Sequence, residues 1–337
     1  MEKRNFIIPE FGPLAGLRVI GAGSLIAMPF AATMMADFGA EVIQIERPKI
    51  GDTYRSFPPL KKTEQGTAGS SWMQDARNRL SMTLELDLND PDVKEIFFRL
   101  IERSDIFIEN MVWLDKLGIH DSELLKINPR LVIVHVSGYG HKEFGGLPEI
   151  CDQASYDMTS QAYSGYALFN GYPDRDPLIV KPSLGDYITA LFALFGMLSA
   201  HISAKNTGRG QVVDVSQFEA QARVMRDAFT MSSLGLAEVQ RCGTKAIGFQ
   251  PWDLFTSRDG IYVSIGAVGK SVFERFMTAA GLDLERYPYE KTSKDKNAVN
   301  SPEGRELDRI INEWCVSYRR RDRRSHAPRP SPVRTRQ

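Results

Sequence analysis

Residues 17–46, which read LRVIGAGSLIAMPFAATMMADFGAEVIQIE, decide the fold class. The apolar run 17–20 predicts a short buried strand, and 21–23 a tight turn. Residues 29–38 have the spacing of a helix, and 41–46 predict a second strand. A strand, a helix and a strand in this order are typical of a parallel sheet whose strands are joined by crossover helices.

The alternation of strands and helices continues along the chain. The nearly unbroken apolar run 131–136 is typical of a parallel strand that is covered on both faces. Helix 91–103 begins with Pro91 at an early helical position, as is common at helix starts. We also predict strands at 81–88, 105–109 and 212–216, and helices at 121–127, about 186–204 and 217–234.

We expect an α/β fold: a doubly wound, mostly parallel sheet domain with a second, smaller α+β domain. The large, Rossmann-like domain is predicted to span 1–224 and the smaller one 225–317. The smaller domain has antiparallel strands within 248–265, and helices at 272–280 and 302–314. Residues 318–337 are rich in arginine and proline and are predicted to be a disordered tail.

Composition narrows the class of protein. Apolar residues make up 42% of the chain and charged residues 25%, as in ordinary soluble proteins. The formal net charge is zero, but the 318–337 segment holds eight arginines and one aspartate and so contributes +7. The remaining body is therefore acidic, which argues against nucleic acid as a partner.

Cysteine usage and hydropathy suggest a location. The three cysteines, Cys151, Cys242 and Cys315, are far apart and form no zinc or redox motif. With no signal peptide visible, they indicate a reducing, cytoplasmic compartment. The longest apolar stretch, near 188–200, is shorter than the ~20 residues that span a bilayer, so we expect a buried core helix and no membrane partner.

The first turn offers a possible nucleotide site. Gly21 and Gly23 after a strand, with the acid Glu46 further on, resemble a dinucleotide fingerprint, but Ile26 stands where the third glycine belongs. A plain strand–helix turn is the competing interpretation. Arg47 favours a ligand with a phosphorylated ribose, because guanidinium groups grip phosphate; coenzyme A and NADP both carry one.

Asp186 is the candidate nucleophile. It stands before a long predicted helix, where a carboxylate is stabilised as the anion. Taken alone, this position favours a plain N-cap, but a capping carboxylate is also a reasonable nucleophile, because it is ionised and fixed in direction. The preceding segment, 137–183, is rich in glycine, proline and aromatic residues and is expected to be a working surface rather than a packed element. The histidines show no metal-ligand spacing, so no metal is predicted, and His135 is expected to be a core histidine.

Taken in order, several segments between residues 11 and 314 resemble the class III CoA-transferases, a family that includes formyl-CoA and L-carnitine CoA-transferases. The resemblance rests on these motifs: Pro13-Leu-Ala-Gly-Leu-Arg-Val19, Phe38-Gly-Ala-Glu-Val-Ile43, Ile45-Glu-Arg-Pro48, Arg77-Asn-Arg79, Glu109-Asn110, Val136-Ser-Gly-Tyr-Gly140, Gln161-Ala-Tyr-Ser-Gly165, Leu184-Gly-Asp186 and Thr207-Gly-Arg-Gly-Gln211.

The resemblance implies an enzyme that moves coenzyme A from an acyl-CoA to a small carboxylic acid. Asp186 would be acylated and would then carry coenzyme A as an aspartyl thioester. No tightly bound cofactor is expected, since coenzyme A and acyl-CoA are substrates. The coenzyme A site would be formed by residues of the large domain: Leu25, Ile26, Ala27, Arg47, Arg79, Asn110, Met111 and Lys116.

The resemblance also implies an interlocked homodimer, although relatives of this family are longer and this chain lacks their closing segment. The opening and Gln161–Gly165 lean towards the carnitine and γ-butyrobetaine branch. One alternative is an acyl-CoA racemase, but Tyr156 stands where the racemase has a histidine, and a phenol is a poor base near neutral pH. An NADP-dependent dehydrogenase and a truncated, inactive homologue that still binds coenzyme A are further alternatives.

Overall fold

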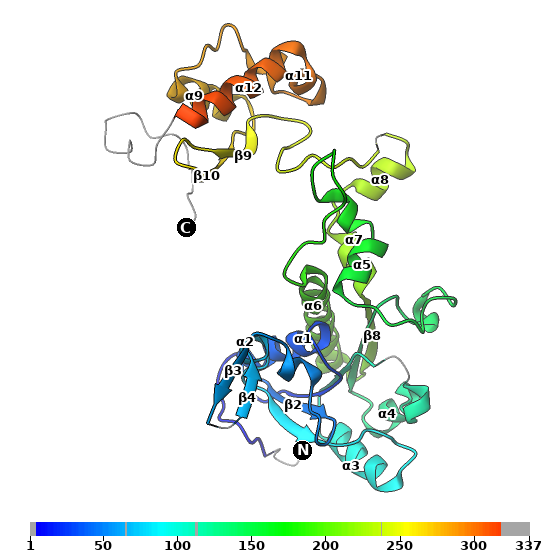
Figure 1. The fold of residues 1–337 in the computed structure, drawn as a ribbon. Coiled ribbons are helices and arrows are strands. Elements are labelled where there is room, and N and C mark those ends of the chain that lie inside the picture. Colours follow the sequence, from blue (N-terminus) through cyan, green and yellow to red (C-terminus); the bar gives the residue numbers. More distant parts are fainter. Residues whose placement is uncertain (1–4, 65, 112–113, 237, 318–337) are drawn as a thin grey trace. The chain divides into compact units, whose positions relative to one another are not determined.

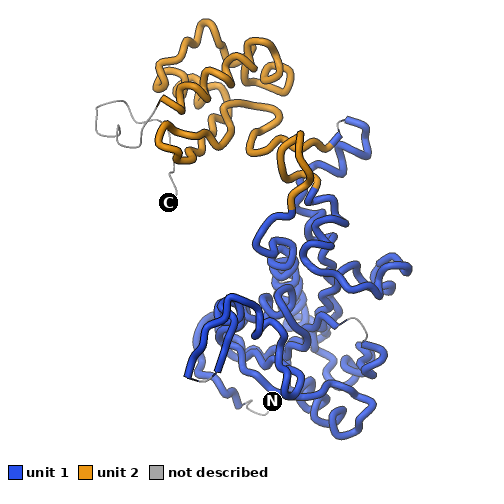
Figure 2. Tube along the Cα trace, viewed as in Figure 1, with its two compact units in different colours: residues 1–167, 179–238 blue, residues 168–178, 239–337 orange. Residues whose placement is uncertain are grey.

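A computed structural model describes residues 5–64, 66–111, 114–236 and 238–317. The predicted tail, 318–337, lies outside these residues. The chain forms two compact units (Figure 2). Unit 1 holds residues 1–167 and 179–238, and unit 2 holds 168–178 and 239–337. The domain boundary after residue 224 stays a prediction, because compactness alone does not show which segments fold independently.

Unit 1 is built on a six-stranded sheet with the order β5-β2-β1-β6-β7-β8. All neighbouring strands run parallel, as expected. In chain order this is 3-2-1-4-5-6, the order of doubly wound nucleotide-binding sheets. The strands are β1 (Arg18–Ala22), β2 (Glu41–Glu46), β5 (Leu80–Thr83), β6 (Ile106–Glu109), β7 (Val132–Ser137) and β8 (Gln211–Ser216).

Helices cover both faces of the sheet, so the predicted fold class is confirmed (Figure 1). Helices α1 (Ala27–Asp37) and α6 (Leu184–Thr207) pack on one face, and α3 (Pro91–Glu102) and α4 (Asp121–Ile127) on the other. Asp90 caps α3 by accepting from the backbone N–H groups of its first turn, and Pro91 fills the first helical position.

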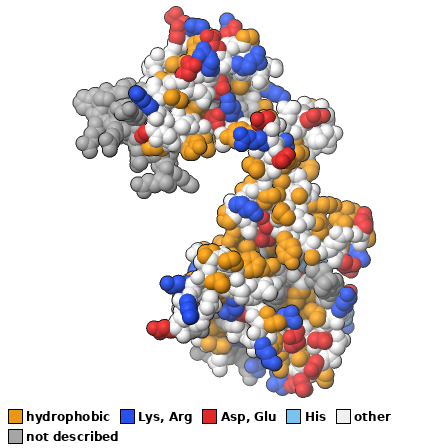
Figure 3. Space-filling model, in the orientation of Figure 1, with side chains coloured by type: hydrophobic (Ala, Val, Ile, Leu, Met, Phe, Trp, Pro, Cys, Tyr) orange, Lys and Arg blue, Asp and Glu red, His pale blue; other side chains and the backbone are white. Residues whose placement is uncertain are grey.

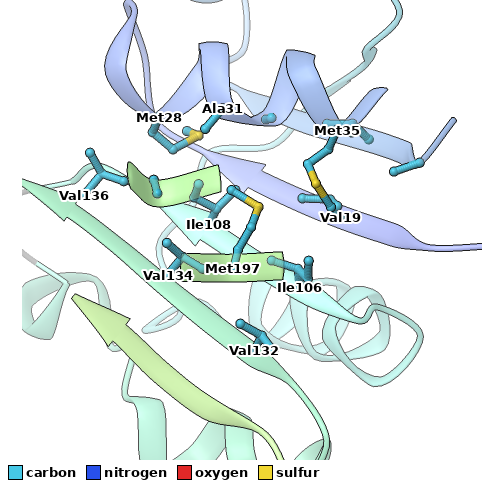
Figure 4. Close-up of a cluster of buried hydrophobic side chains, with 14 of the residues drawn as sticks. Val19, Met28, Ala31, Met35, Ile106, Ile108, Val132, Val134, Val136 and Met197 are labelled. Atoms are coloured by element: carbon cyan, nitrogen blue, oxygen red, sulfur yellow. The ribbon is translucent and has the colours of Figure 1, made fainter. Parts of the chain in front are cut away.

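Alternate residues of each strand point to opposite faces, so each central strand serves two cores. Ile106 and Ile108 of β6 join the core beneath α1 and α6, whereas Phe107 between them joins the core beneath α3 and α4. Figure 4 shows the first core, in which Met28 of α1 and Met197 of α6 meet side chains of the sheet. Each fully buried side chain of this size contributes roughly 1.5–3 kcal/mol.

Helix α6 is the central element of unit 1. It has 24 residues and is the one helix in the described part of the chain that is long and apolar enough to cross a membrane. Its buried residues, among them Ala193, Met197 and Ala200, recur every three or four positions and pack on the sheet and α1. The predicted core helix therefore has one face in the core. Its outer face is also apolar, since Phe195 is 73% exposed.

Several elements differ from the sequence-based expectation. The helix predicted at 217–234 breaks into α7 (Gln217–Arg223) and α8 (Ala228–Ser233), because Arg226 between them takes a positive φ of 55°. The strand expected at 81–88 pairs only over β5. The segment 137–183 contains a packed helix, α5 (Asp157–Tyr163).

Other elements of unit 1 were not expected at all. A hairpin and a short helix follow β2, and four 3₁₀ turns lie in the loops. They are β3 (Leu60–Thr63), β4 (Gly66–Gly69), α2 (Ser70–Asp75), η1 (Thr53–Ser56), η2 (Asp115–Leu117), η3 (Lys142–Phe144) and η4 (Tyr166–Phe169).

Unit 2 is a small α+β body, as predicted. Strands β9 (Trp252–Thr256) and β10 (Tyr262–Gly266) form an antiparallel hairpin. Phe255 and Ile265, from the two strands, pack with Phe273 and Leu307 of the helices. The helices are α9 (Lys270–Ala280), α10 (Tyr289–Thr292), α11 (Lys296–Asn300) and α12 (Pro302–Ser317).

The buried His135 joins three elements of unit 1. Its Nδ1 lies 2.6 Å from Glu109 Oε1 at the end of β6, and its Nε2 lies 3.0 Å from Asp121 Oδ2 at the start of α4. Burial by itself lowers the pKa of His135, but hydrogen bonds to the two carboxylates outweigh it and raise the pKa to about 10. The predicted core histidine is therefore a buried imidazolium bridging two acids.

We expect His135→Gln to lower the free energy of unfolding by about 3–5 kcal/mol near neutral pH, because it leaves two acids without their partner. The stabilisation by His135 should be complete below pH 6.5 and lost as the pH rises towards 10, since its folded-state pKa is raised. Denaturant unfolding at several pH values measures both effects. The control is His120→Gln, whose side chain is 50% exposed beside Asp115 and should cost at most ~1 kcal/mol.

Candidate functional site

Five of the eight predicted coenzyme A residues lie at the point where the strand order reverses. Strands β1 and β6 are neighbours in the sheet, but the chain leaves them in opposite directions. Ligands of doubly wound sheets bind at this switch point, outside the carboxyl ends of the strands. The turn after β1 carries Leu25, Ile26 and Ala27, and the turn after β6 carries Asn110 and Met111.

Asn110 locks these two turns together. Its Oδ1 accepts from the backbone N–H of Ser24 at 3.0 Å, and its Nδ2 donates to the Ser24 carbonyl at 2.9 Å. Gly23 permits this close approach, because a Cβ there would lie 1.8 Å from Asn110 Oδ1 and its φ is +141°. Asn110 therefore holds the shape of the first turn, and both polar atoms of its side chain are engaged in doing so.

Asp52 supports the same turn from outside. Its Oδ1 accepts from the N–H of Leu25 at 3.1 Å and from that of Tyr54 at 2.9 Å. Leu25 takes a positive φ of 70°, which aims its N–H at this carboxylate. The Asp52 side chain is buried, and this burial raises its pKa. Its Oδ2 has no partner among the described residues.

Arg79 lies beneath the turn. Its Nη1 donates to Gln44 Oε1 at 2.9 Å, and Gln44 Nε2 donates to the Gly23 carbonyl at 2.9 Å. Burial lowers the pKa of Arg79 to about 10, so the guanidinium stays charged at neutral pH. The charge also lies 5.3 Å from the ring centre of Trp72. Arg79 therefore supplies positive charge next to the turn, where the phosphates of coenzyme A were expected.

The other two predicted cationic residues lie on the surface of unit 1. Arg47 follows β2, and its Nε lies 3.7 Å from Glu85 Oε1 with both side chains about two-thirds exposed. Such an ion pair stabilises little and is easily opened by a ligand. Lys116 lies in the 3₁₀ turn η2, also exposed.

Asp186 is not an N-cap, which corrects the sequence-based expectation. Helix α6 begins at Leu184, so Asp186 lies within its first turn. The backbone N–H of Gly185 donates instead to Asp157 Oδ1 of helix α5, at 2.8 Å. A carboxylate 28 residues earlier in the chain thus satisfies the helix start and leaves the Asp186 carboxylate available for chemistry.

The Asp186 carboxylate is partly exposed, and one of its oxygens is held. Gln217 Nε2 of α7 donates to Asp186 Oδ1 at 2.5 Å. Burial and the negative charge of Asp157 raise the pKa of Asp186 to about 7, while the Gln217 hydrogen bond works against them. Asp186 is therefore ionised in a large share of molecules near neutral pH, and it is more basic than an ordinary aspartate.

A hydrogen-bonded chain connects Asp186 with the turn after β1. Tyr187, the next residue, donates from Oη to Asp75 Oδ2 at 2.7 Å, and Tyr54 donates to the same oxygen at 2.9 Å. Tyr54 is in turn bonded to Asp52, which holds Leu25. The ring of Tyr187 also meets Phe30 of α1 edge-on, with centroids 4.8 Å apart. Tyr187, the residue after the predicted nucleophile, is thus linked to the predicted coenzyme A turn; that Asp186 and this turn form one site stays a prediction.

Gln161 holds Asp157 in place. Its Nε2 lies 3.0 Å from both carboxylate oxygens of Asp157 and also donates to the Val180 carbonyl. Its Oε1 accepts from the N–H of Val180 at 2.9 Å. The Gln161 segment, which the sequence singled out for its family resemblance, therefore fixes the carboxylate next to Asp186.

Glu109, at the end of β6, belongs to a group of potential metal ligands. Donor atoms of Glu109, His135 and His141 lie within 4.8 Å of one another. Two ligands of one tetrahedral zinc ion are about 3.3 Å apart, whereas the 2.6 Å between Glu109 and His135 is a hydrogen bond. His141 is likewise bonded to Asp214, at 2.7 Å. These distances describe ion pairs, and the absence of a bound metal stays a prediction.

Unit 2 contains a cavity of about 520 Å³, with Arg241, Lys296, Trp252 and Cys242 among the residues that line it. None of the predicted site residues lines this cavity. All of its lining residues belong to unit 2.

Sequence reasoning missed four polar residues of the site: Asp52, Asp75, Asp157 and Gln217. One signal was available. Gln217 directly follows β8, and side chains just past the carboxyl ends of parallel strands are the usual site residues of such sheets. The other three act through contacts between distant segments, which no local pattern reveals.

Comparison with known proteins identifies the family. The model of CoA-transferase family III matches residues 14–325. This chain belongs to that family. It is 39% identical over 310 residues to the bile acid CoA-transferase BaiK of Clostridium scindens, and 32% identical over 318 residues to the L-carnitine CoA-transferase of Proteus mirabilis. These alignments cover 91% and 92% of this chain, and 63% and 73% of the relatives.

Solved structures agree with the family. A CAIB/BAIF family protein from Brucella suis superposes with a TM-score of 0.76 at 26% identity, over 92% of this chain and 80% of that one.

A further relative by sequence is the alpha subunit of a succinyl-CoA–L-malate CoA-transferase from Chloroflexus aurantiacus. It is 34% identical, over 79% of this chain and 61% of its own length. The chain thus spans about 60% of the length of the first curated relatives that it matches.

We expect Gly23→Ala to disrupt the coenzyme A turn, because the new methyl group collides with the Asn110 amide at a φ that costs an alanine about 1–3 kcal/mol. Gly66→Ala is the matched control, since its φ is +132° and nothing lies within 4 Å of an added Cβ. Thermal unfolding with and without coenzyme A measures stability and binding. Equal losses in the two variants would show that Asn110 does not lock the turn.

Proposed function

We propose that this chain is a CoA-transferase that acts through a covalent intermediate on Asp186. The arrangement of Asp186 carries the proposal: its partly exposed carboxylate lies in the first turn of α6, and Tyr187 and Asp75 connect it with the switch point. Membership of CoA-transferase family III supports the reaction class. The predicted coenzyme A residues around the first turn supply the binding surface.

In the proposed reaction, a carboxylate oxygen of Asp186 attacks the carbonyl carbon of the donor acyl-CoA. The carbon–sulfur bond breaks, and coenzyme A thiolate leaves behind a mixed anhydride. The thiolate then attacks the aspartyl carbonyl and releases the donor as its free carboxylate. The acceptor carboxylate next attacks the aspartyl thioester and expels the coenzyme A thiolate, which leaves a second mixed anhydride. The thiolate then attacks the acceptor carbonyl, giving the CoA thioester of the acceptor and the free Asp186 carboxylate. One thioester replaces another, so no ATP is needed.

For substrates, we propose an acyl-CoA donor and a carboxylic acid acceptor. The sequence motifs favour carnitine or γ-butyrobetaine as the acid, and the 32% identity to an L-carnitine CoA-transferase supports that class. The 39% identity to a bile acid CoA-transferase supports a larger, more apolar acid. Assays should therefore include both kinds of acceptor.

We also propose the homodimer that the resemblance implies. The outer face of α6 supports it, because Leu191, Phe195 and Ile202 are 49–73% exposed. Figure 3 shows further apolar side chains gathered on the visible face of unit 1. Apolar surface of this extent usually marks an interaction site. The cytoplasmic location stays a prediction.

The competing activities have less support. The racemase interpretation requires a base at Tyr156, which is 63% exposed at the start of α5, and a phenol is a poor base near neutral pH. Membership of a CoA-transferase family argues against an NADP-dependent dehydrogenase. A homologue that binds coenzyme A without turnover would form no covalent adduct.

Trapping tests the proposal directly. After incubation with acyl-CoA and a quench with hydroxylamine, we expect mass spectrometry to place a hydroxamate on Asp186. Asp186→Asn should abolish the adduct and lower acyl transfer by several orders of magnitude, as expected for loss of a nucleophile. Asp92→Asn, which alters an exposed aspartate in the first turn of α3, is the matched control. Acyl transfer that persists in Asp186→Asn would exclude the mechanism.

The rate of adduct formation should depend on pH. Because the carboxylate is the attacking form, we expect the rate to rise with pH and to level off above about 7, the pKa of Asp186. Single-turnover trapping between about pH 5 and about 9 measures the curve. A rate that is already independent of pH from about 5 upward would mean that the pKa of Asp186 stays near the ordinary 3.8 of aspartate and that burial does not perturb it.

A further inference from the structure

Gln217 contacts the reacting group without having been recognised from the sequence. It is the first residue of α7 and directly follows the last residue of β8. Its side chain is 5% exposed, and its Nε2 donates to Asp186 Oδ1 at 2.5 Å. In the described part of the chain, no cationic side chain forms an ion pair with Asp186. The Gln217 amide is the side-chain donor that holds this carboxylate.

The rest of the Gln217 amide is unsatisfied. Its Oε1 is buried and has no hydrogen-bond partner among the described residues. Leaving a buried polar atom without a partner costs about 1–3 kcal/mol, so stability alone does not account for an amide at this position. A buried polar group without a partner needs an explanation, and a catalytic role is one of them.

On the basis of the proposed covalent role of Asp186, we propose that Gln217 is a catalytic residue that holds Oδ1 throughout the reaction. Its hydrogen bond leaves Oδ2 as the oxygen that attacks the thioester. When Asp186 is acylated, Oδ1 becomes the carbonyl oxygen of the aspartyl group, with the same N–H donor beside it.

The Gln217 hydrogen bond lowers the barrier when the aspartyl carbonyl is attacked. As the thiolate sulfur bonds to Cγ, the electron pair of the carbonyl moves onto Oδ1, and the Gln217 N–H stabilises that negative charge. The intermediate collapses by restoring the carbonyl and breaking the Cγ–Oδ2 bond, which releases the donor carboxylate. When the acceptor carboxylate later attacks Cγ of the thioester, charge develops on Oδ1 again and the Cγ–S bond breaks.

The charged surroundings explain why a neutral donor suits this position. Asp157, from α5, is the charged neighbour that acts on Asp186, and its negative charge disfavours a second anion beside it. Gln217, from α7, offsets this effect without forming an ion pair that would hold the carboxylate too firmly to react. A donor that only tuned the resting carboxylate would affect acylation alone, whereas an oxyanion donor must affect the later steps.

Helix α7 offers a matched control one turn further on. Gln221 is fully buried, donates from Nε2 to Ser160 Oγ at 2.6 Å and likewise has an unpartnered Oε1. The described structure gives it no bond to Asp186. Gln221→Leu therefore reproduces the loss of a buried amide from α7 and leaves the Asp186 carboxylate with its donor.

The test measures two rates separately on the full chain. Acetyl-CoA, butyryl-CoA and succinyl-CoA are offered as donors, and the one that acylates the wild type is used with its own acid as acceptor. The first rate is the formation of the hydroxylamine-trapped adduct at about pH 9, well above the pKa of about 7 of Asp186. The second is the decay of the isolated aspartyl-CoA form after the acid is added, followed by mass spectrometry.

We expect Gln217→Leu to slow the decay by about 10²–10³-fold, as removal of one oxyanion donor does, and to slow adduct formation by less than about tenfold. Gln221→Leu should change neither rate by more than a few-fold. Equal losses of both rates in Gln217→Leu, or no loss of the decay rate, would overturn the role of Gln217. If the wild type forms no adduct with any donor, the proposed function itself fails, and the role of Gln217 fails with it.

Gln217→Glu provides a second measurement that keeps the shape of the side chain. Its protonated carboxyl group can donate to Oδ1, whereas its ionised form repels the developing oxyanion. We expect the decay of aspartyl-CoA in this variant to slow as the pH rises, and to approach the wild-type rate at low pH. A pH dependence like that of the wild type would count against the proposal even if Gln217→Leu failed to fold.

Discussion

The geometry of the site depends on one buried carboxylate, that of Asp75 in α2. Its Oδ2 accepts hydrogen bonds from Tyr54, which follows β2, and from Tyr187, which follows Asp186 in α6. Hydrogen bonds to a charged acceptor are worth about 1.5–3 kcal/mol each. Two segments that are far apart in the sequence are thereby fixed to the same oxygen. Tyr187, next to the proposed nucleophile, and Tyr54, next to the predicted coenzyme A turn, keep their relative position because both are bonded to Asp75.

The sequence predicted the sheet and its helices well. The strand at 41–46 and the helix at 121–127 have the expected bounds, because clear apolar periodicity and strong boundary residues coincide there. The hairpin of β3 and β4 escaped notice, since nearly all of its residues are exposed and no apolar pattern marks it. The break between α7 and α8 was missed because the residues around Arg226 continue a helical pattern.

The site was predictable only in part. The turns after β1 and β6 come together because the strand order places them at the switch point. The alternation of strands and helices predicts a doubly wound sheet but does not fix this order. The roles of Asp157 and Gln217 do not follow from local sequence. Asp157, which belongs to α5, accepts the backbone N–H at the start of α6 that Asp186 was expected to cap. Such contacts are set by how helices pack, and the same residue types occur on many exposed surfaces.

Gly185 shows how narrow the tolerance of this region is. An added Cβ at that residue would lie 2.5 Å from the Gln221 amide nitrogen, and Gln221 is itself bonded to Ser160. A side chain at this position would require the Gln221 amide to move and would strain its bond to Ser160. The residue before Asp186 therefore couples the start of α6 to the packing of α5 and α7, so a change in either neighbouring helix is felt at the beginning of α6.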